Sequence, residues 1–351
     1  MKLSSFFKGK SVLITGNTGF IGSWISKWLV MLDSNVAGYS IGPPSNPNLY
    51  DAVGLGNDIE NVRGDVRDYN KLMKTIYDLQ PDLVLHLAAQ PIVLDSYENP
   101  EDTFSTNVMG TVNLLNALLK VGSSKEIIVM TSDKVYQNLG TEYHYRETDS
   151  LGGNDPYSAS KSCQDIIANS YWESYFIGSG VGVSRVRSGN VMGGGDWGKF
   201  RIIPDIVYGI VNNKTLKIRN PSYTRPWVHV LDVAYGILNL AQRMNEDIDL
   251  SGAWNFGPLP SQRVTVKHLV SKFTESWGKG NYETEGREAF KEASNLALDA
   301  SKANRRLFWK PSFNFESALG STVSWYKSFY GGVNAKEITE NQIMKYPLGA
   351  E

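Results

Sequence analysis

Cysteine, histidine and excess charge are all scarce in this chain of 351 residues. The single cysteine, Cys163, excludes an internal disulfide, and the four scattered histidines have no spacing that would hold a metal ion. A formal net charge of −1 without a polybasic run gives no basis for binding nucleic acid or anionic lipid. The apolar runs are far shorter than a membrane span, and residues 1–8 lack the apolar core of a signal peptide. We therefore expect a cytoplasmic protein that binds no metal, nucleic acid or membrane.

Short apolar runs alternate with amphipathic stretches, which indicates the α/β class. With 41% hydrophobic and 20% charged residues, the chain is long enough for one large domain and a smaller lobe. Buried strands are predicted near 11–15, 35–40, 62–67, 83–87, 127–130 and 181–186, with helices near 23–32, 69–79, 100–119 and 157–175. We predict a Rossmann-type doubly wound parallel sheet, mainly over residues 1–187. A smaller C-terminal α/β substrate lobe over 188–351 would follow, with some of its segments returning to the first domain.

A glycine-rich turn follows the first predicted strand. Gly16, Gly19 and Gly22 have the spacing G-x-x-G-x-x-G and precede an amphipathic helix. Glycines let the backbone approach a pyrophosphate, and the helix N-terminus offers free N–H groups and the positive end of a dipole. We interpret this stretch as a dinucleotide-binding turn rather than a purely structural one.

The second predicted strand ends at Ser40, without the acidic residue that contacts the NAD ribose or the arginine that meets the 2′-phosphate of NADP. An uncharged, proline-rich loop follows at 41–47. A 2′-phosphate would meet no cation here, so NAD is favoured by elimination. Asp65, in the third predicted strand, is placed to reach the adenine. It would serve equally well as the N-cap of the helix that begins near Tyr69.

Polar residues after the fifth apolar run are the strongest candidates for chemistry. Ser132, Asp133 and Lys134 fall at the carboxyl end of a central strand, where open α/β sheets bind ligands. Downstream, Tyr157 and Lys161 are four positions apart and share one face of a predicted helix. A lysine ammonium would lower the pKa of the phenol and suit Tyr157 to proton transfer. Chance alone would supply about one such Tyr–Lys pair in this chain, so its significance depends on the residues that precede it.

Two further positions follow the strand near 83–87. Ala88 and Ala89 place small side chains where a cofactor would lie close to the sheet. Asn107, in the next helix, is either a buried residue that orients the site or a satisfied polar group of the core.

The C-terminal half contributes a glycine-dense stretch and three arginines. Residues 188–198 are predicted to form an irregular loop that lines a second site. Arg201, Arg219 and Arg225 fall in predicted loops or strand ends, and arginine forks bind diphosphates bidentately. For any single arginine a surface ion pair is the commoner role, but the group favours an anion site. The tail from residue 331 is polar, and we expect it to be loosely held.

Taken together, residues 16–22, residues 131–136 and the Tyr157/Lys161 pair resemble the extended short-chain dehydrogenase/reductase family, whose members modify nucleotide sugars. Within that family the chain is more similar to the CDP-glucose 4,6-dehydratases, and the resemblance extends from about residue 7 to residue 346. It is carried by the motifs at 16–24, 86–91, 131–134, 155–158, 189–197, 219–221, 225–230 and 252–258.

The pair Asp133-Lys134 is the most discriminating feature of this resemblance. Related epimerases have an uncharged pair there, and the dTDP-sugar dehydratases have Asp-Glu. Asn17 and Ile21 depart from the family pattern, which has His and Lys at these positions, so nucleotide affinity or NAD retention is expected to differ.

The resemblance implies a lyase that dehydrates a nucleotide-activated hexose, with CDP-glucose as the expected substrate and NAD as the cofactor. Hydride would pass from C4 of the sugar to NAD and return to C6 after water is lost across C5 and C6. Ser132, Tyr157 and Lys161 would form the catalytic triad, and Asp133 would protonate the departing hydroxyl. The C5 base would be Lys134 or a water that it holds.

The resemblance also assigns binding residues. Those for the cofactor, besides Tyr157 and Lys161, are Gly16, Thr18, Gly19, Phe20, Ile21, Gly22, Asp65, Val66, Leu87, Ala88, Ala89 and Asn107. Those for the substrate are Gln90, Asn190, Arg201, Arg219, Arg225 and His229. A homodimer through helices of the cofactor domain is expected by analogy. The alternatives are a nucleotide-sugar 4-epimerase, a dehydratase for another nucleotide, and a non-enzymatic NAD-binding scaffold.

Overall fold

The computed structural model describes residues 2–259, 264–284 and 295–347. Its centre is a seven-stranded sheet in the order β11-β6-β5-β4-β1-β2-β3, in which every neighbouring pair is parallel. The strands are β1 (Ser11–Thr15), β2 (Asn35–Ser40), β3 (Glu60–Arg63), β4 (Leu83–His86), β5 (Glu126–Met130), β6 (Gly182–Ser188) and β11 (Gly252–Phe256). The strand order reverses between β1 and β4, which opens a crevice at the carboxyl ends of these strands. The predicted Rossmann-type sheet is confirmed.

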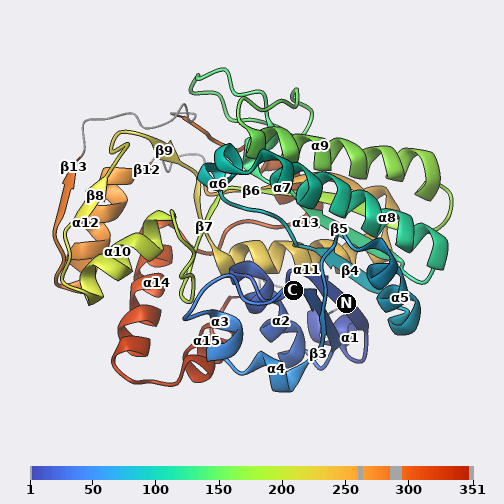
Figure 1. Ribbon diagram of the computed structural model, residues 1–351, viewed down its shortest axis with the longest axis horizontal. Helices are drawn as coiled ribbons and strands as arrows, with labels where there is room; N and C mark the ends of the chain where they lie inside the picture. Colours follow the sequence, from blue (N-terminus) through green and yellow to red (C-terminus); the bar gives the residue numbers. More distant parts are fainter. Residues whose placement is uncertain (1, 260–263, 285–294, 348–351) are drawn as a thin grey trace.

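Alternating side chains along each strand feed two separate cores. In β1, Val12 and Ile14 join the core that contains α2 (Phe20–Met31) and α11 (Val230–Glu246), whereas Leu13 joins the core on the opposite face. That second core is formed with α5 (Tyr69–Leu79), α8 (Gly110–Val121) and α9 (Pro156–Tyr171), which lie together on the right of Figure 1. Helices therefore cover both faces, as expected of a doubly wound sheet.

Several predicted elements have different ends in the structure. The helix expected near 100–119 consists of α7 (Pro100–Phe104), a π-helical turn over Ser105–Met109, and α8. Helix α9 likewise runs into a π-helical turn over Trp172–Phe176. The glycine-dense stretch that we predicted to be irregular contains β7 (Asn190–Met192), which pairs in parallel with β10 (Trp227–His229).

Helix α11 was absent from our predictions, although it covers a large part of one sheet face. Its buried Asp232 anchors the C-terminal part of the chain through hydrogen bonds. The carboxylate accepts the N–H of Ser312 at 2.7 Å and the hydroxyl of Tyr346 at 2.8 Å. Because these groups satisfy it, a carboxylate can be buried at this position.

The expectation of a loosely held tail is wrong for residues 331–347. Helix α15 (Ala335–Met344) contacts α2. Lys27 of α2, whose side chain is only 2% exposed, forms ion pairs with Glu340 at 2.6 Å and with Asp58 at 3.1 Å. Tyr346 is also buried, so this segment is anchored to the core that contains α2 and α11. Residues 348–351 lie outside the described chain.

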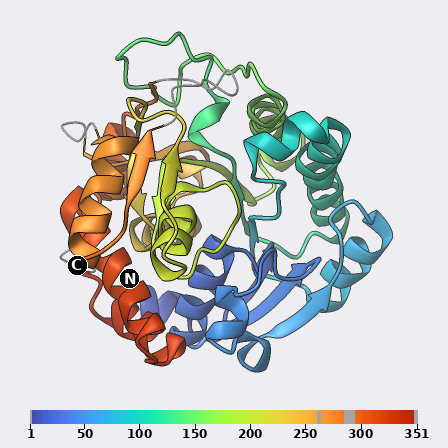
Figure 2. The same cartoon turned by 60° about the vertical axis from the view of Figure 1, so that its left-hand side comes forward.

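Smaller elements build the second lobe, which Figure 1 shows on the left and Figure 2 brings forward. Its helices are α10 (Ile202–Val211), α12 (Val266–Trp277) and α14 (Phe315–Tyr330). Its short strand pairs are β8 (Leu216–Ile218) with β13 (Tyr282–Thr284) and β9 (Thr224–Arg225) with β12 (Val264–Thr265).

The other α-helices of the described chain are short: α1 (Leu3–Phe7), α3 (Leu49–Ala52), α4 (Leu55–Asp58), α6 (Val93–Glu98) and α13 (Ser301–Leu307). Within the described ranges, no helix has the length and apolar character needed to cross a membrane.

Candidate active site

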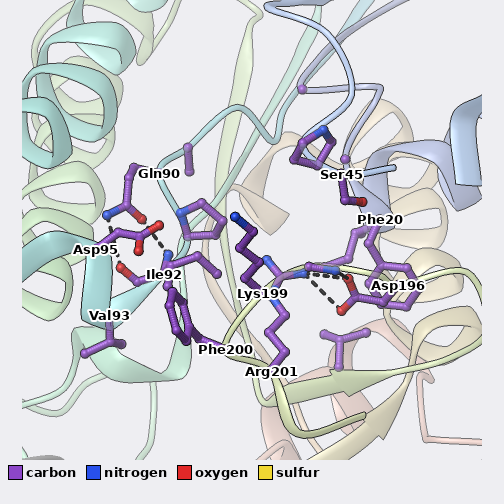
Figure 3. Close-up of a pocket in the computed structure, with 18 of the residues that line it drawn as sticks. Phe20, Ser45, Gln90, Ile92, Val93, Asp95, Asp196, Lys199, Phe200 and Arg201 are labelled. Atoms are coloured by element: carbon purple, nitrogen blue, oxygen red, sulfur yellow. Dashed lines mark hydrogen bonds and ion pairs between the residues drawn. The ribbon is translucent and has the colours of Figure 1, made fainter. Parts of the chain in front are cut away.

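A cavity of about 1010 Å³ lies at the carboxyl ends of the central strands and extends into the second lobe. The glycine turn lines one part of it, and Asp205 and Arg219 of the lobe line another. In Figure 3, Gln90 and Asp95 lie on one side and Asp196 and Arg201 on the other, with Lys199 between them. The cavity thus brings together segments that are far apart in the sequence.

The glycine turn has the shape that a dinucleotide requires. Gly16 has a φ of 76°, and a Cβ there would lie 2.7 Å from the backbone nitrogen of Ala88. Helix α2 begins directly after Gly19, and no side chain caps its N-terminus. Gly16, Thr18, Gly19, Phe20, Ile21 and Gly22 all line the cavity. An uncapped helix N-terminus facing an open cavity fits a pyrophosphate.

The two departures from the family pattern have different surroundings. Asn17 is buried, fills the space beside Gly38 and donates from Nδ2 to Oδ1 of Asn61 at 3.3 Å. Ile21, in contrast, lines the cavity. Asn17 therefore tethers the turn to β3, and Ile21 is the position where a changed side chain would face the cofactor.

Asp65 and Val66 line the cavity next to the glycine turn. The Asp65 carboxylate pairs with the guanidinium of Arg67, at 2.6 Å between Oδ2 and Nη2, and these hydrogen bonds lower its pKa. The alternative that Asp65 caps α5 is wrong, because Asp68 does so by accepting the N–H of Lys71 at 3.1 Å.

One cation near the end of β2 was missed in the sequence. Arg63, at the end of β3, lies beside Gly42, with Nη2 3.5 Å from where a Cβ of Gly42 would be. The loop after β2 carries no charge of its own, but the parallel pairing of β2 and β3 brings this guanidinium next to it. A cation therefore does lie near the end of β2, although Arg63 itself does not line the cavity.

Four of the five predicted catalytic residues line the same cavity: Ser132, Lys134, Tyr157 and Lys161. Ser132 and Lys134 follow β5, and the other two lie in the first turns of α9. Asp155 caps α9 by accepting the N–H of Ser158 at 2.9 Å, with Pro156 in its first turn, as the sequence predicts.

We expected the pKa of Tyr157 to be lowered, but it is raised to about 12. Burial is the main cause, and the negative charge of Asp133 adds to it. A hydrogen bond with Ser132 and the positive charge of Arg201 act in the opposite direction. The nearby cation that favours the phenolate is thus Arg201, a residue that we had assigned to substrate binding alone.

The amino group of Lys161 is held inside the protein. Nζ donates to the carbonyl oxygen of Met130 at 3.1 Å and to Oε1 of Gln164 at 2.7 Å. Burial lowers the pKa of Lys161 to about 7. A group with this pKa is only partly charged near neutral pH.

Asp133 is the fifth predicted catalytic residue, and it lies behind the cavity wall. It is buried, and its Oδ1 accepts the hydroxyl of Ser132 at 3.1 Å. Lys134 donates its N–H to the same hydroxyl at 3.2 Å. In the structure Asp133 therefore orients Ser132, and direct protonation of a substrate hydroxyl would require its side chain to move.

A buried hydrogen-bonded chain behind Lys161 was not predicted. Gln164 donates from Nε2 to the hydroxyl of Thr111 at 2.8 Å, and that hydroxyl lies 3.0 Å from Nε2 of His86. The other ring nitrogen of His86 lies 2.7 Å from the hydroxyl of Thr15. Burial and the charge of Lys161 lower the pKa of His86 to about 3, so the imidazole is neutral. This chain ties the catalytic helix to β1, β4 and α8.

A second unpredicted link fixes α9 to the sheet. The carboxylate of Asp165 receives two hydrogen bonds of 2.8 Å from the guanidinium of Arg187 on β6. Both groups are buried, and Arg187 also donates to the hydroxyl of Tyr136 at 2.9 Å. Tyr157, Lys161 and Asp165 recur every four residues, so one helix face carries the predicted catalytic pair and the carboxylate that anchors the helix.

Residues after β4 lie where the sequence predicts, with one correction. Leu87, Ala88, Ala89 and Gln90 line the cavity. Asn107 is fully buried behind them, where its Oδ1 accepts the N–H of Gln90 at 2.8 Å and its Nδ2 donates to Ser160 at 2.9 Å. Asn107 therefore does not line the cavity, and its contacts with Gln90 and Ser160 favour the interpretation that it orients the site.

The three arginines converge on the cavity, together with Asn190. Nη1 of Arg201 pairs with the carboxylate of Asp196 at 3.0 Å (Figure 3). Arg225 is buried and donates from Nη1 to the carbonyl oxygen of Thr224 at 2.9 Å, whereas Arg219 is exposed to the cavity. Their positive charge gives the lobe side of the cavity the character of an anion site.

His229 is the one substrate assignment that the structure contradicts. It is fully buried, its ring packs 4.3 Å from the ring of Phe313, and Nδ1 accepts the N–H of Leu231 at 3.2 Å. His229 is thus the N-cap of α11. A side chain used in this way cannot also reach a ligand.

The fold, the glycine turn and the cavity with Ser132, Tyr157 and Lys161 define an extended short-chain dehydrogenase/reductase. More narrowly, the model of the family described as GDP-mannose 4,6 dehydratase matches residues 13–322, and the chain belongs to that family. The chain is 42% identical over 349 residues to a CDP-glucose 4,6-dehydratase of Salmonella typhimurium strain LT2, with 97% of each chain covered. It is 26% identical over 332 residues to a probable dTDP-glucose 4,6-dehydratase of Sinorhizobium fredii, covering 90% of this chain and 92% of that protein.

Solved structures share the fold. An epimerase from Methanothermobacter thermautotrophicus superposes with a TM-score of 0.80 at 24% identity, covering 97% of this chain and 96% of that one. A dTDP-glucose 4,6-dehydratase from Streptomyces venezuelae, solved with NAD bound, has a TM-score of 0.78 at 24% identity, with 93% and 99% covered.

Proposed function

We propose that this protein is an NAD-dependent hydro-lyase that converts CDP-glucose to CDP-4-keto-6-deoxyglucose. One observation carries the proposal. In a chain 42% identical to a CDP-glucose 4,6-dehydratase, Ser132, Lys134, Tyr157 and Lys161 line one cavity with a glycine turn that fits a dinucleotide. NAD, when bound at this turn, supplies the acceptor for the C4 hydride and later its donor to C6.

The protein's own groups provide the proton transfers. Tyr157 would take the proton of the C4 hydroxyl, helped by Ser132 and by the positive charge of Arg201, which both favour its ionised form. The 4-keto group makes the C5 proton acidic, and Lys134, which faces the cavity, would remove it directly or through a water. Asp133 is the proposed acid for the C6 hydroxyl, acting after a rearrangement of its contact with Ser132.

The competing activities are a nucleotide-sugar 4-epimerase and a dehydratase for another nucleotide. Incubation with CDP-, dTDP-, GDP- and UDP-glucose, followed by mass analysis, separates them because dehydration removes one water and epimerisation leaves the mass unchanged. We expect water loss from CDP-glucose above all. Unchanged mass with every substrate would favour an epimerase or an inactive scaffold.

We also propose which part of the chain binds each ligand, and that the protein is a homodimer. Residues 1–187 would bind NAD and most of 188–351 the nucleotide sugar, while β11 and α11 complete the cofactor domain.

A homodimer would form through α8 and α9. Two apolar side chains are exposed there: Met109, just before α8, is 51% exposed, and Ile166 of α9 is 53% exposed. Light scattering would test the assembly: an Ile166→Glu variant that keeps the mass of the wild-type protein would place any interface elsewhere.

The proposed diphosphate contacts predict the effect of removing an arginine. Arg219→Ala or Arg225→Ala should each raise the dissociation constant for CDP-glucose tenfold or more, because a charge-assisted contact contributes on the order of 1.5–3 kcal/mol. The affinity for NAD should not change. Calorimetric titration of each ligand measures both, with Lys214→Ala as an exposed control on the same lobe. Damage to NAD binding alone would show that the division into two lobes is wrong.

A further inference from the structure

Asp205 is a carboxylate that faces the cavity and has no role in the chemistry described above. It lies in the first turn of α10 and lines the cavity, together with the apolar residues Pro204 and Ile218 and the cationic Arg219. No group within the described ranges donates a hydrogen bond to its side chain. The protein therefore presents a hydrogen-bond acceptor to the cavity without a partner of its own.

Its surroundings keep this carboxylate ionisable at neutral pH. Burial raises the pKa of Asp205 to about 6, the charge of Arg219 lowers it, and that of Asp196 raises it. Above this pKa the group is an acceptor only. A ligand that offers an N–H at this point would satisfy it, whereas a carbonyl oxygen would meet a negative charge.

The position of Asp205, beside Arg219 in the lobe part of the cavity, suits it to the nucleoside end of the substrate. Arg201 acts electrostatically on Tyr157, where the hexose would react, and Asp205 follows Arg201 in the first turn of α10 on the lobe side of the cavity. Asp205 lies one helical turn, about 6 Å, along α10 from Arg201. A nucleotide sugar that starts at Tyr157 and passes its diphosphate by the arginines would bring its base toward Asp205, with Pro204 and Ile218 as apolar contacts.

The pyrimidine bases differ in the group that they would place there. Cytosine carries an exocyclic amino group, which donates, whereas uracil and thymine carry a carbonyl oxygen, which accepts. We propose that the Asp205 carboxylate accepts a hydrogen bond from the cytosine amino group and so selects cytidine nucleotides over uridine and thymidine nucleotides. This inference rests on the proposed function for the substrate class and adds the residue that reads the base.

Binding of the free nucleotides CDP and UDP tests the proposal without any turnover. We expect the wild-type protein, with NAD bound, to prefer CDP over UDP at least tenfold in calorimetric titrations. Asp205→Asn should reduce this preference at least tenfold, since the amide can also donate to a uracil oxygen. Asp205→Leu should weaken CDP binding without strengthening UDP binding.

Asp95→Asn is the matched control, because Asp95 is another carboxylate that lines the cavity, on the side opposite Arg201 (Figure 3). It should keep the wild-type preference for CDP. Equal weakening of CDP and UDP in Asp205→Asn would overturn the proposal and assign Asp205 to holding Arg219. Equal affinities in the wild-type protein would overturn it as well. Intact discrimination without dehydration of CDP-glucose would refute the proposed function but leave the role of Asp205 standing.

Discussion

Replacing Tyr157 by phenylalanine is expected to lower turnover of CDP-glucose at least ~10²-fold while the fold and NAD affinity remain intact. The phenol is the candidate proton acceptor for the C4 hydroxyl, and it lines the cavity beside Ser132. Its hydroxyl is the only group that the substitution removes. Steady-state rates, with circular dichroism and NAD titration as checks of folding, measure the effect.

Tyr97→Phe is a suitable control, because Tyr97 also lines the cavity and has no proposed part in proton transfer. Near-normal turnover in a folded Tyr157→Phe protein would remove Tyr157 from the mechanism. Burial holds the pKa of Tyr157 near 12 in the absence of ligands, so its role as a base requires the pKa to fall when NAD binds. An ultraviolet titration of tyrosinate with and without NAD would detect that fall.

The second large effect concerns Asp133 and Lys134. In the proposed mechanism, oxidation at C4 needs Ser132, Tyr157 and Lys161, whereas loss of water also needs a C5 base and a C6 acid. The double variant Asp133→Asn, Lys134→Met should therefore accumulate NADH when given CDP-glucose, visible as nicotinamide absorbance, and release no product lighter by one water. The wild-type protein should show no lasting NADH.

The contact between Asp133 and Ser132 calls for single variants beside the double one. Lys134→Met keeps that hydrogen bond and should separate C5 deprotonation from any disturbance of Ser132. Asp133→Asn should slow both half-reactions if its main task is to orient the serine. Continued loss of water in the double variant would place the acid and the base elsewhere in the cavity.

Local patterns alone determined the glycine turn, the cap of α9 and most strands of the sheet. These features depend on neighbouring residues: apolar runs that form buried strands, Gly16 that adopts a positive φ, and Asp155 with Pro156 that begins a helix. The grouping of Ser132, Tyr157 and Lys161 also follows from local sequence, because strand ends and helix starts of parallel units meet at one edge of the sheet.

Tertiary packing decided which candidate residues reach the cavity. His229 and Asn107 have side chains suited to ligand binding. In the structure, however, His229 caps a helix and Asn107 accepts a hydrogen bond from Gln90, so both side chains are held inside the protein. Helix α11 escaped prediction because it is buried on several sides and carries polar residues, such as Asp232, whose partners are distant in sequence. No local pattern reveals such partners.

Electrostatics depended most on the three-dimensional structure. Spacing in the sequence pairs Tyr157 with Lys161, yet the folded protein directs Lys161 to Met130 and Gln164 and brings Arg201 near the phenol. The fold, and not the spacing in the sequence, also places Arg63 beside Gly42 and Asp205 in the cavity. The sequence determined which chemical groups are available. The fold determined their pKa values and partners, because burial and distance to other charges exist only once the chain has folded.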